Sequence, residues 1–248
     1  MEISFDHRFI FIHVYRAGGM SVGNALKPYA WAPNRHLVKV PLVRKMGMTG
    51  LHRLQDHYYG HIKAKELKAA LPDVFDDFFK FTFVRNTWAW HVSIYHYVRQ
   101  RTDHPEYELL RPLNSFEEYL EWRVRERPEQ QREFVLDDDG ELIVDFVGHH
   151  ETLHEDFTTV CRRIGIEPTL PYINQSAHED FREYYTDETR ALVAEVWKGD
   201  IDYFGFEFDD PQRLEPIIGP REAAGRALRS SGSRAAAPAP APRAPRAG

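Results

Sequence analysis

A segment near the start of the chain combines the residue types that bind anions. Phe9–His13 is apolar or aromatic and predicts a short buried strand. Arg16, Gly18, Gly19 and Ser21 follow, and a helix can begin directly after them. Backbone N–H groups at a strand–turn–helix junction converge on one point, where the helix dipole adds partial positive charge. A cation and a hydroxyl on the turn favour a phosphate or sulfate; the alternative is an ordinary βα turn with incidental glycines. Residues 15–21 are called the anion turn below.

A second strand, loop and helix follow the same plan. Residues 77–86 are rich in aromatic and β-branched side chains and predict a buried strand that ends at Arg85. Ser93 lies eight residues further on, about two turns into the helix that should follow. Repeated strand, loop and helix units imply parallel strands with crossover helices. The sequence therefore predicts an α/β domain.

Local signals predict the remaining elements. Cys161 shares the apolar face of an amphipathic helix, so we expect a core residue there and not a nucleophile. Helices are expected at 62–71, ended by Pro72, at 115–122, capped by Ser115, at 151–166 and from 187, with a hairpin turn near Asp139 and Gly140.

Length and composition predict one cytoplasmic domain. The 248 residues are 42% hydrophobic and include one cysteine, which suits a reducing compartment. No apolar run approaches the ~18 residues of a membrane helix. The first residues are acidic and lack the apolar region of a secretory signal, so we expect none.

Charge separates the domain from its tail. Residues 211–248 carry a net charge of +5, which leaves −11 on residues 1–210. An acidic body is unlike a nucleic-acid-binding protein, so no nucleic-acid partner is expected. Residues 229–248 are rich in Ala, Pro and Arg. We therefore expect a folded domain over 1–210 and a disordered tail over 211–248.

Four segments together resemble one enzyme superfamily. FIHVYRAGGMSV resembles the phosphosulfate-binding loop of the sulfotransferases, and FFKFTFVRNTWAWHVSIYHY resembles their second signature. The segments that begin DFVGHHETLHEDF and LPYINQSAHEDF are similar to the C-terminal half of the bacterial and Golgi carbohydrate sulfotransferases, the branch of sulfotransferase family 2. The resemblance covers roughly residues 8–208, in order.

The resemblance implies a P-loop-like, three-layer α/β domain with a central parallel sheet flanked by helices. It also implies the co-substrate 3′-phosphoadenosine 5′-phosphosulfate (PAPS), whose sulfuryl group passes to a hydroxyl or amine. Arg85 and Ser93 match the residues that hold the 3′-phosphate. Arg16, placed near the bridging oxygen, and the turn around it match the residues that hold the 5′-phosphosulfate: Ala17, Gly18, Gly19, Met20 and Ser21.

The acceptor needs a general base, for which His61 is the first candidate. It aligns with a catalytic histidine of the uronyl 2-O-sulfotransferase branch, and a pKa near neutrality suits the role. A capping or core histidine is the alternative reading of His61. His52, His57 and Glu66 are fallback bases, whereas His149 and His150 are expected to pack or lie at the surface.

Further contacts with the acceptor and the nucleotide are expected from segments outside these motifs. Residues 27–58 and 99–135 are expected to meet a sugar or other polar acceptor, although a partner protein or plain surface would also suit them. Candidate residues there are Trp31, Arg35, His36, Tyr107, Trp122 and Arg123. Asn174, Ser176, Arg182 and Tyr185 match a family element near the nucleotide, with a structural loop as the alternative.

Departures from the family pattern leave a second function open. Tyr15, Arg16 and Ala17 replace the usual Pro-Lys-Thr, and Met20 replaces a threonine. The alternative is therefore a nucleotide- or glycan-binding module with little turnover. A P-loop kinase is disfavoured because the G-x-x-x-x-G-K-[ST] pattern is missing. No His/Cys/Asp cluster has metal-ligand spacing, so no metal is expected.

Overall fold

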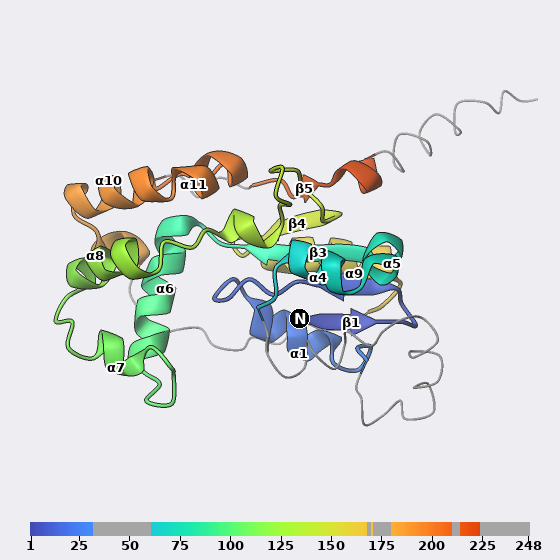
Figure 1. The fold of residues 1–248 in the computed structure, drawn as a ribbon, viewed down its shortest axis with the longest axis horizontal. Helices are drawn as coiled ribbons and strands as arrows, with labels where there is room; N and C mark the ends of the chain where they lie inside the picture. The colour runs from blue at the N-terminus through green and yellow to red at the C-terminus, as the bar shows by residue number, and fades with distance from the viewer. Residues whose placement is uncertain (32–60, 168–169, 171–179, 210–213, 224–248) are drawn as a thin grey trace, which may run out of the picture.

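The computed structural model describes residues 1–31, 61–167, 170, 180–209 and 214–223. Figure 1 shows a sheet with helices packed around it and a group of helices beyond one end of the strands. Five strands form the sheet within these residues, in the order β1-β2-β3-β4-β5. They are β1 (Glu2–Ser4), β2 (Phe9–Phe11), β3 (Phe79–Val84), β4 (Phe146–His149) and β5 (Ile217–Ile218).

The central strands are parallel and the edge strands are antiparallel. β3 pairs in parallel with both β2 and β4, whereas β1 pairs with β2, and β5 with β4, in the antiparallel sense. The predicted α/β class is confirmed, with parallel pairing restricted to the centre of the sheet. Neither short edge strand was predicted from the sequence.

The helices begin and end largely where local signals predict. Ser115 accepts a hydrogen bond from Glu118 N at 3.1 Å and caps α8. Pro72 follows one helix, as expected, but also begins the next, because proline at a first helical position loses no backbone hydrogen bond. The helices are α1 (Gly19–Leu26), α4 (Ala64–Ala70), α5 (Pro72–Asp77), α6 (Thr87–Arg99), α7 (Tyr107–Leu110), α8 (Phe116–Glu126), α9 (Leu153–Ile164), α10 (Asp187–Val196), α11 (Lys198–Phe204) and the 3-10 helices Gln131–Phe134 and Phe181–Tyr184.

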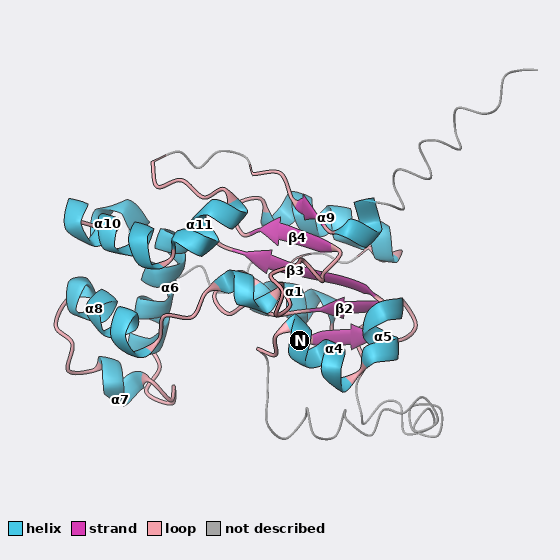
Figure 2. Cartoon of the chain, turned by 45° about the horizontal axis from the view of Figure 1, so that its top comes forward, coloured by secondary structure: helices cyan, strands magenta, loops and turns pink. Residues whose placement is uncertain are grey.

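Alternating side chains of the strands build two apolar layers. Phe11 and Phe81 belong to a cluster on one face with residues of α1 and α9, including Cys161 as predicted. Ile10 and Ile12 belong to a second cluster with residues of α4, α5 and α6. Because neighbouring strand residues point to opposite faces, the sheet is the middle of three layers (Figure 2).

The folded part of the chain continues beyond residue 210. β5 pairs with β4, and Gly219 N donates to Asp145 O at 2.9 Å. Glu222 is 7% exposed and pairs with Arg163 at 3.0 Å. The boundary expected at 210 therefore precedes the last element of the sheet. The Ala/Pro/Arg-rich residues 229–248 lie outside the described residues.

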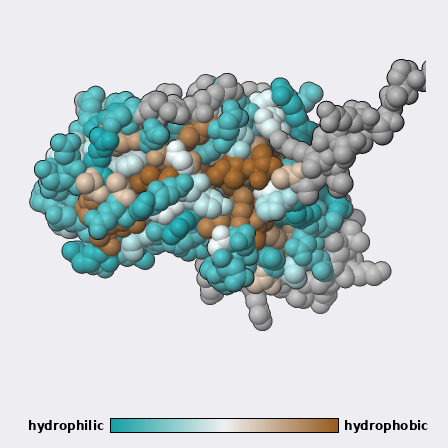
Figure 3. All heavy atoms as spheres, turned by 90° about the horizontal axis from the view of Figure 1, so that it is seen from above, coloured by the Kyte–Doolittle hydropathy of each residue, from teal (hydrophilic) through white to brown (hydrophobic). Residues whose placement is uncertain are grey.

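Met20, a residue of the anion turn, exposes an apolar side chain at the surface. On the face in Figure 3, hydrophilic atoms dominate the periphery and hydrophobic atoms gather near the middle. Met20 is 41% exposed at the start of α1.

None of the helices in the described ranges is long and apolar enough to cross a membrane.

A buried ion pair joins β3 to the segment before β4. Lys80 Nζ lies 2.8 Å from Asp145 Oδ2 and donates to Phe78 O at 2.9 Å. The same carboxylate oxygen accepts from Lys80 N at 2.9 Å. Burial lowers the pKa of Lys80, and Asp145 opposes that effect. The charges are 1% and 5% exposed, so neither can regain water if its partner is removed.

We expect Lys80→Met to lower the free energy of unfolding by about 3–5 kcal/mol, because Asp145 would remain buried without its cation. Urea unfolding measures this change. Lys80→Met combined with Asp145→Asn should recover part of the loss, since the amide oxygen introduced at position 145 can still accept from the backbone N–H of residue 80. A loss below about 1 kcal/mol in the single variant would contradict the assignment.

Candidate functional site

The candidate anion site lies where the three parallel strands end. Arg16 follows β2, Arg85 follows β3 directly, and His150 and Glu151 follow β4. In sheets of this kind, ligands bind at the carboxyl ends of the strands. The topology therefore brings together side chains that lie up to 135 residues apart in the sequence.

The backbone of the anion turn requires its glycines. Gly18 has φ +83°, in the left-handed region, and a Cβ there would lie 2.7 Å from Leu153 Cδ2. A Cβ on Gly19 would lie 1.8 Å from His13 Cδ2, so the imidazole occupies the space that any side chain would need. Arg16 also adopts a left-handed backbone, with φ +60°. The glycines thus allow the chain to turn tightly from β2 into α1.

Arg16, Arg85 and Ser93, three of the residues expected in the site, lie close together in the structure. Arg16 Nε donates to Ser93 Oγ at 3.0 Å, and Arg85 Nη1 lies 3.4 Å from Arg16 O. Ser93 is fully buried in α6. The Arg16 guanidinium also stacks over Tyr97, 4.2 Å from the ring centroid. Tyr97 was missed from the sequence, although its position one turn after Ser93 places it on the same side of α6.

Arg85 is held rigidly through its backbone. Its N–H donates to Gln131 Oε1 at 2.9 Å, and its carbonyl accepts from Gln131 Nε2 at 2.7 Å. Among the described residues, Arg85 Nε has no hydrogen-bond partner. Burial lowers the pKa of Arg85 to about 10, Glu151 opposes this shift and Arg16 adds to it. An anion between the arginines would relieve both the missing hydrogen bond and the repulsion.

Two further residues at this edge come from the end of β4. Burial, followed by Arg85 and Arg16, lowers the pKa of His150 to about 3, so the imidazole is neutral at pH 7. Glu151 Oε1 accepts from Asn86 N at 2.9 Å, and burial raises its pKa. Asn86 in turn caps α6, accepting from Trp88 N at 3.2 Å. His149 is buried as expected, but the position of His150 beside Arg85 could not be read from the sequence.

His61 lies next to the anion turn. Its Nδ1 is 3.0 Å from His13 O, and its ring centroid is 4.6 Å from that of His13. Although the residue is exposed, packing around the ring displaces water and lowers its pKa, partly offset by the His13 carbonyl. His13 is neutral as well: burial and then His61 lower its pKa to about 2. His61 is therefore an uncharged imidazole near the anion turn.

Several other expected site residues have structural contacts. Tyr185 Oη donates to Trp88 O at 2.9 Å, and Arg182 Nε donates to Phe208 O at 3.1 Å. Glu66 caps the start of α4 by accepting from Lys63 N at 2.9 Å. His52, His57, Arg35, His36, Asn174 and Ser176 lie outside the described residues.

The acceptor residues expected in 99–135 need correction. Trp122 is 8% exposed and Arg123 is 2% exposed, because both lie on the inner face of α8. Neither can offer a surface to an acceptor in this conformation. Trp31 packs with its ring edge against Phe5, at 6.5 Å between centroids. Within the described residues, no three His, Cys, Asp or Glu side chains gather as a metal site would require.

We expect Gly19→Ala to destabilise the protein by about 1–3 kcal/mol, because the new methyl group must displace the His13 ring. Gly23→Ala in the same helix is the matched control, since its Cβ would meet only Glu2 Oε1 at 3.7 Å. It should stabilise by up to about 1 kcal/mol. Thermal unfolding compares the two. Equal effects would contradict the steric argument, and adding His13→Ala should reduce the cost of Gly19→Ala.

Known proteins similar to this chain include one relative in sequence and one in structure. No family model matches it. An uncharacterized protein of Archaeoglobus fulgidus is 29% identical over 111 residues, which is 44% of this chain and 88% of the relative. The crystal structure of mouse sulfotransferase SULT7A1 complexed with PAP aligns over 92% of this chain and 88% of its own, with 11% identity and a TM-score of 0.47.

Proposed function

We propose that the chain is a sulfotransferase that moves the sulfuryl group of PAPS to a hydroxyl or amine of a carbohydrate or other polar acceptor. The observation that carries the proposal is the meeting of Arg16, Arg85 and Ser93 at the end of the parallel strands. Among the described ion pairs, neither arginine is bound to a carboxylate. Two such cations beside a glycine turn suit a ligand with separate anionic groups.

Arg85 and Ser93 would hold the 3′-phosphate. The Ser93 hydroxyl accepts from Arg16 Nε, which leaves its own proton free; because Ser93 is fully buried in this conformation, a phosphate oxygen would reach it only after neighbouring side chains move aside. Arg85 Nε, which is buried and has no hydrogen-bond partner among the described residues, would become a second donor on the same rearrangement. Gln131 already fixes the backbone of Arg85, so binding would cost little conformational entropy in this part of the chain.

The anion turn would hold the 5′-phosphosulfate. Backbone N–H groups of residues 17–21 lie at the start of α1, where the helix dipole favours negative charge. Arg16 uses Nε for Ser93, so its terminal nitrogens are the atoms available to the bridging oxygen. Bound PAPS supplies an activated sulfuryl group, and these residues would position it and stabilise charge on the leaving oxygen.

His61 would take the proton of the acceptor. If Nδ1–H donates to His13 O, Nε2 carries the lone pair and is the basic nitrogen. The lowered pKa keeps this ring neutral at pH 7, as a general base requires. The acceptor hydroxyl would then attack sulfur as its proton moves to Nε2, while the bond between sulfur and the bridging oxygen breaks and 3′-phosphoadenosine 5′-phosphate leaves.

We expect Arg85→Met to weaken binding of 3′-phosphoadenosine 5′-phosphate (PAP) by about 10- to 100-fold, because a charge-assisted hydrogen bond contributes about 1.5–3 kcal/mol. Isothermal titration calorimetry measures the affinity. Arg162→Met, at an exposed position of α9, is the control and should leave it unchanged. Unchanged affinity in a folded Arg85→Met variant would refute the nucleotide site.

We expect His61→Asn to reduce sulfuryl transfer by about 100-fold or more while PAP affinity changes less than about threefold. The wild-type rate should rise with pH as the ring loses its proton, with a midpoint below the ordinary histidine pKa of about 6.5, because burial lowers the His61 pKa. Labelled PAPS with a panel of sugars and polar metabolites provides the assay. Transfer at the normal rate in His61→Asn would exclude this base, and binding without transfer would favour a binding module.

A further inference from the structure

The strained residue of the anion turn, Arg16, directly follows Tyr15. Arg16 has φ +60°, a backbone conformation that residues with a side chain rarely adopt. Strain of this kind persists only where surrounding contacts impose it. A proline before Arg16 would restrict the backbone and a glycine would relax it, but position 15 carries a tyrosine. Tyr15, the residue directly before Arg16, makes contacts with two helices that could impose this conformation.

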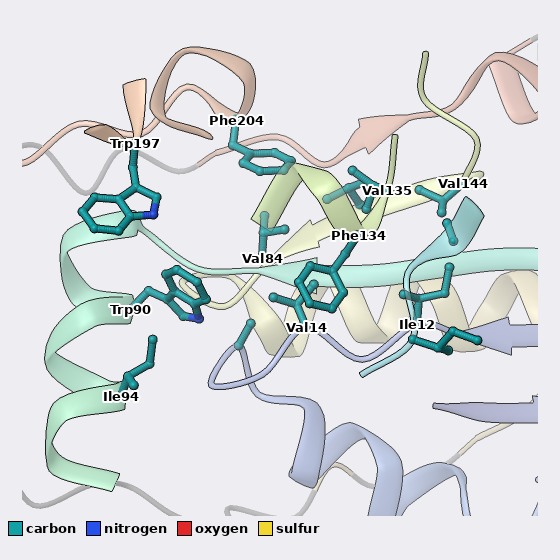
Figure 4. Packing of buried hydrophobic residues seen from close by; sticks show 14 of the residues in the cluster. Ile12, Val14, Val84, Trp90, Ile94, Phe134, Val135, Val144, Trp197 and Phe204 are labelled. Carbon is teal, nitrogen blue, oxygen red and sulfur yellow. The ribbon is translucent and has the colours of Figure 1, made fainter. Parts of the chain in front are cut away.

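Tyr15 is held at both its backbone and its hydroxyl. Trp90 Nε1 donates to Tyr15 O at 2.6 Å, and the two rings lie 4.9 Å apart. Figure 4 shows Trp90 projecting from α6 toward the segment after β2. At the far end of the side chain, Arg123 Nη2 lies 3.1 Å from Tyr15 Oη. Two helices thus fix one residue from two directions.

Arg123 makes few other contacts that would explain its burial. It is 2% exposed, its nearest carboxylate oxygen, on Glu129, is 3.5 Å away, and its Nε has no partner among the described residues. Its guanidinium also lies 5.8 Å from the centroid of the Trp90 ring. Burial tends to lower the pKa of Arg123, but Tyr119 and Tyr15 outweigh it and the pKa is raised, so the group stays charged.

We propose that Arg123 and Trp90 are positioning residues for the anion turn, acting through Tyr15. They hold the Tyr15 hydroxyl and carbonyl so that Arg16 keeps its left-handed backbone and directs its guanidinium to Ser93. The Tyr15 ring also lies 5.6 Å from the His61 ring, so the same residue contacts the candidate base. The part of this inference that concerns nucleotide affinity rests on the proposed function.

The first test needs no ligand. Hydrogen exchange followed by mass spectrometry reports opening of the peptide spanning residues 17–26, where Val22 N donates to Gly18 O at 3.2 Å. Tyr15→Phe and Trp90→Phe each remove one hydrogen bond and keep a ring. We expect each to speed exchange of this peptide by about fivefold or more, with little change in α9. Ile164→Val, a mild core change at the end of α9, is the control for general destabilisation.

The second test measures PAP affinity by calorimetry in the same variants. Tyr15→Phe and Arg123→Met should each weaken binding by about three- to tenfold, and the double variant should be no worse than the weaker-binding single variant, because both remove one contact. Arg123→Lys, which keeps the charge, should recover part of the affinity lost in Arg123→Met. A purely structural role would predict neither the non-additivity nor the recovery.

The outcomes separate this proposal from the proposed function. Exchange within twofold of wild type in Tyr15→Phe would overturn the positioning role, as would an equal increase in Ile164→Val. Additive losses of PAP affinity would overturn it too. If wild type fails to bind PAP but exchange responds as expected, the positioning role stands and the nucleotide assignment falls. Tyr15→Phe decides the matter even if Arg123→Met does not fold.

Discussion

The parallel pairing of β2, β3 and β4 is the constraint on which the site depends. Phe9 pairs with Phe79, and Phe81 with Phe146, so three chain segments from distant parts of the sequence end at one edge. Each strand is flanked by apolar layers, and a slip by one residue would turn those side chains into the wrong layer. The packing of the core therefore fixes the relative positions of the arginines beyond it.

Positive charge at this edge of the sheet is only partly compensated by negative charge. Arg16 and Arg85 lie close together in surroundings that penalise their charge, and Glu151 offsets only part of that penalty. The nearby imidazoles of His13 and His150 stay neutral mainly because they are buried, and Arg16 further lowers the pKa of each. An anion is the group that such surroundings favour, whereas a cation would add to the repulsion.

Features set by residues close together in the sequence could be predicted from it, and contacts between distant residues could not. The adjacent glycines, the cap at Ser115 and the spacing of Arg85 and Ser93 are encoded within short stretches, and the structure confirms the first two. Arg123 reaches Tyr15 across 108 residues, and nothing in a helix stripe shows which charged residue faces inward. Nor does a strand of two or three residues, such as β5, have room for a periodic pattern.

The edge strand β5 has a consequence for how the chain can be divided. Beyond residue 210 it closes the open side of β4, satisfies Asp145 O through Gly219, and brings Glu222 to Arg163. A protein cut at residue 210 would expose the backbone of β4, and an exposed strand edge recruits other chains. The positively charged residues 211–248 therefore include a strand of the sheet and are not separable from the domain as a single tail.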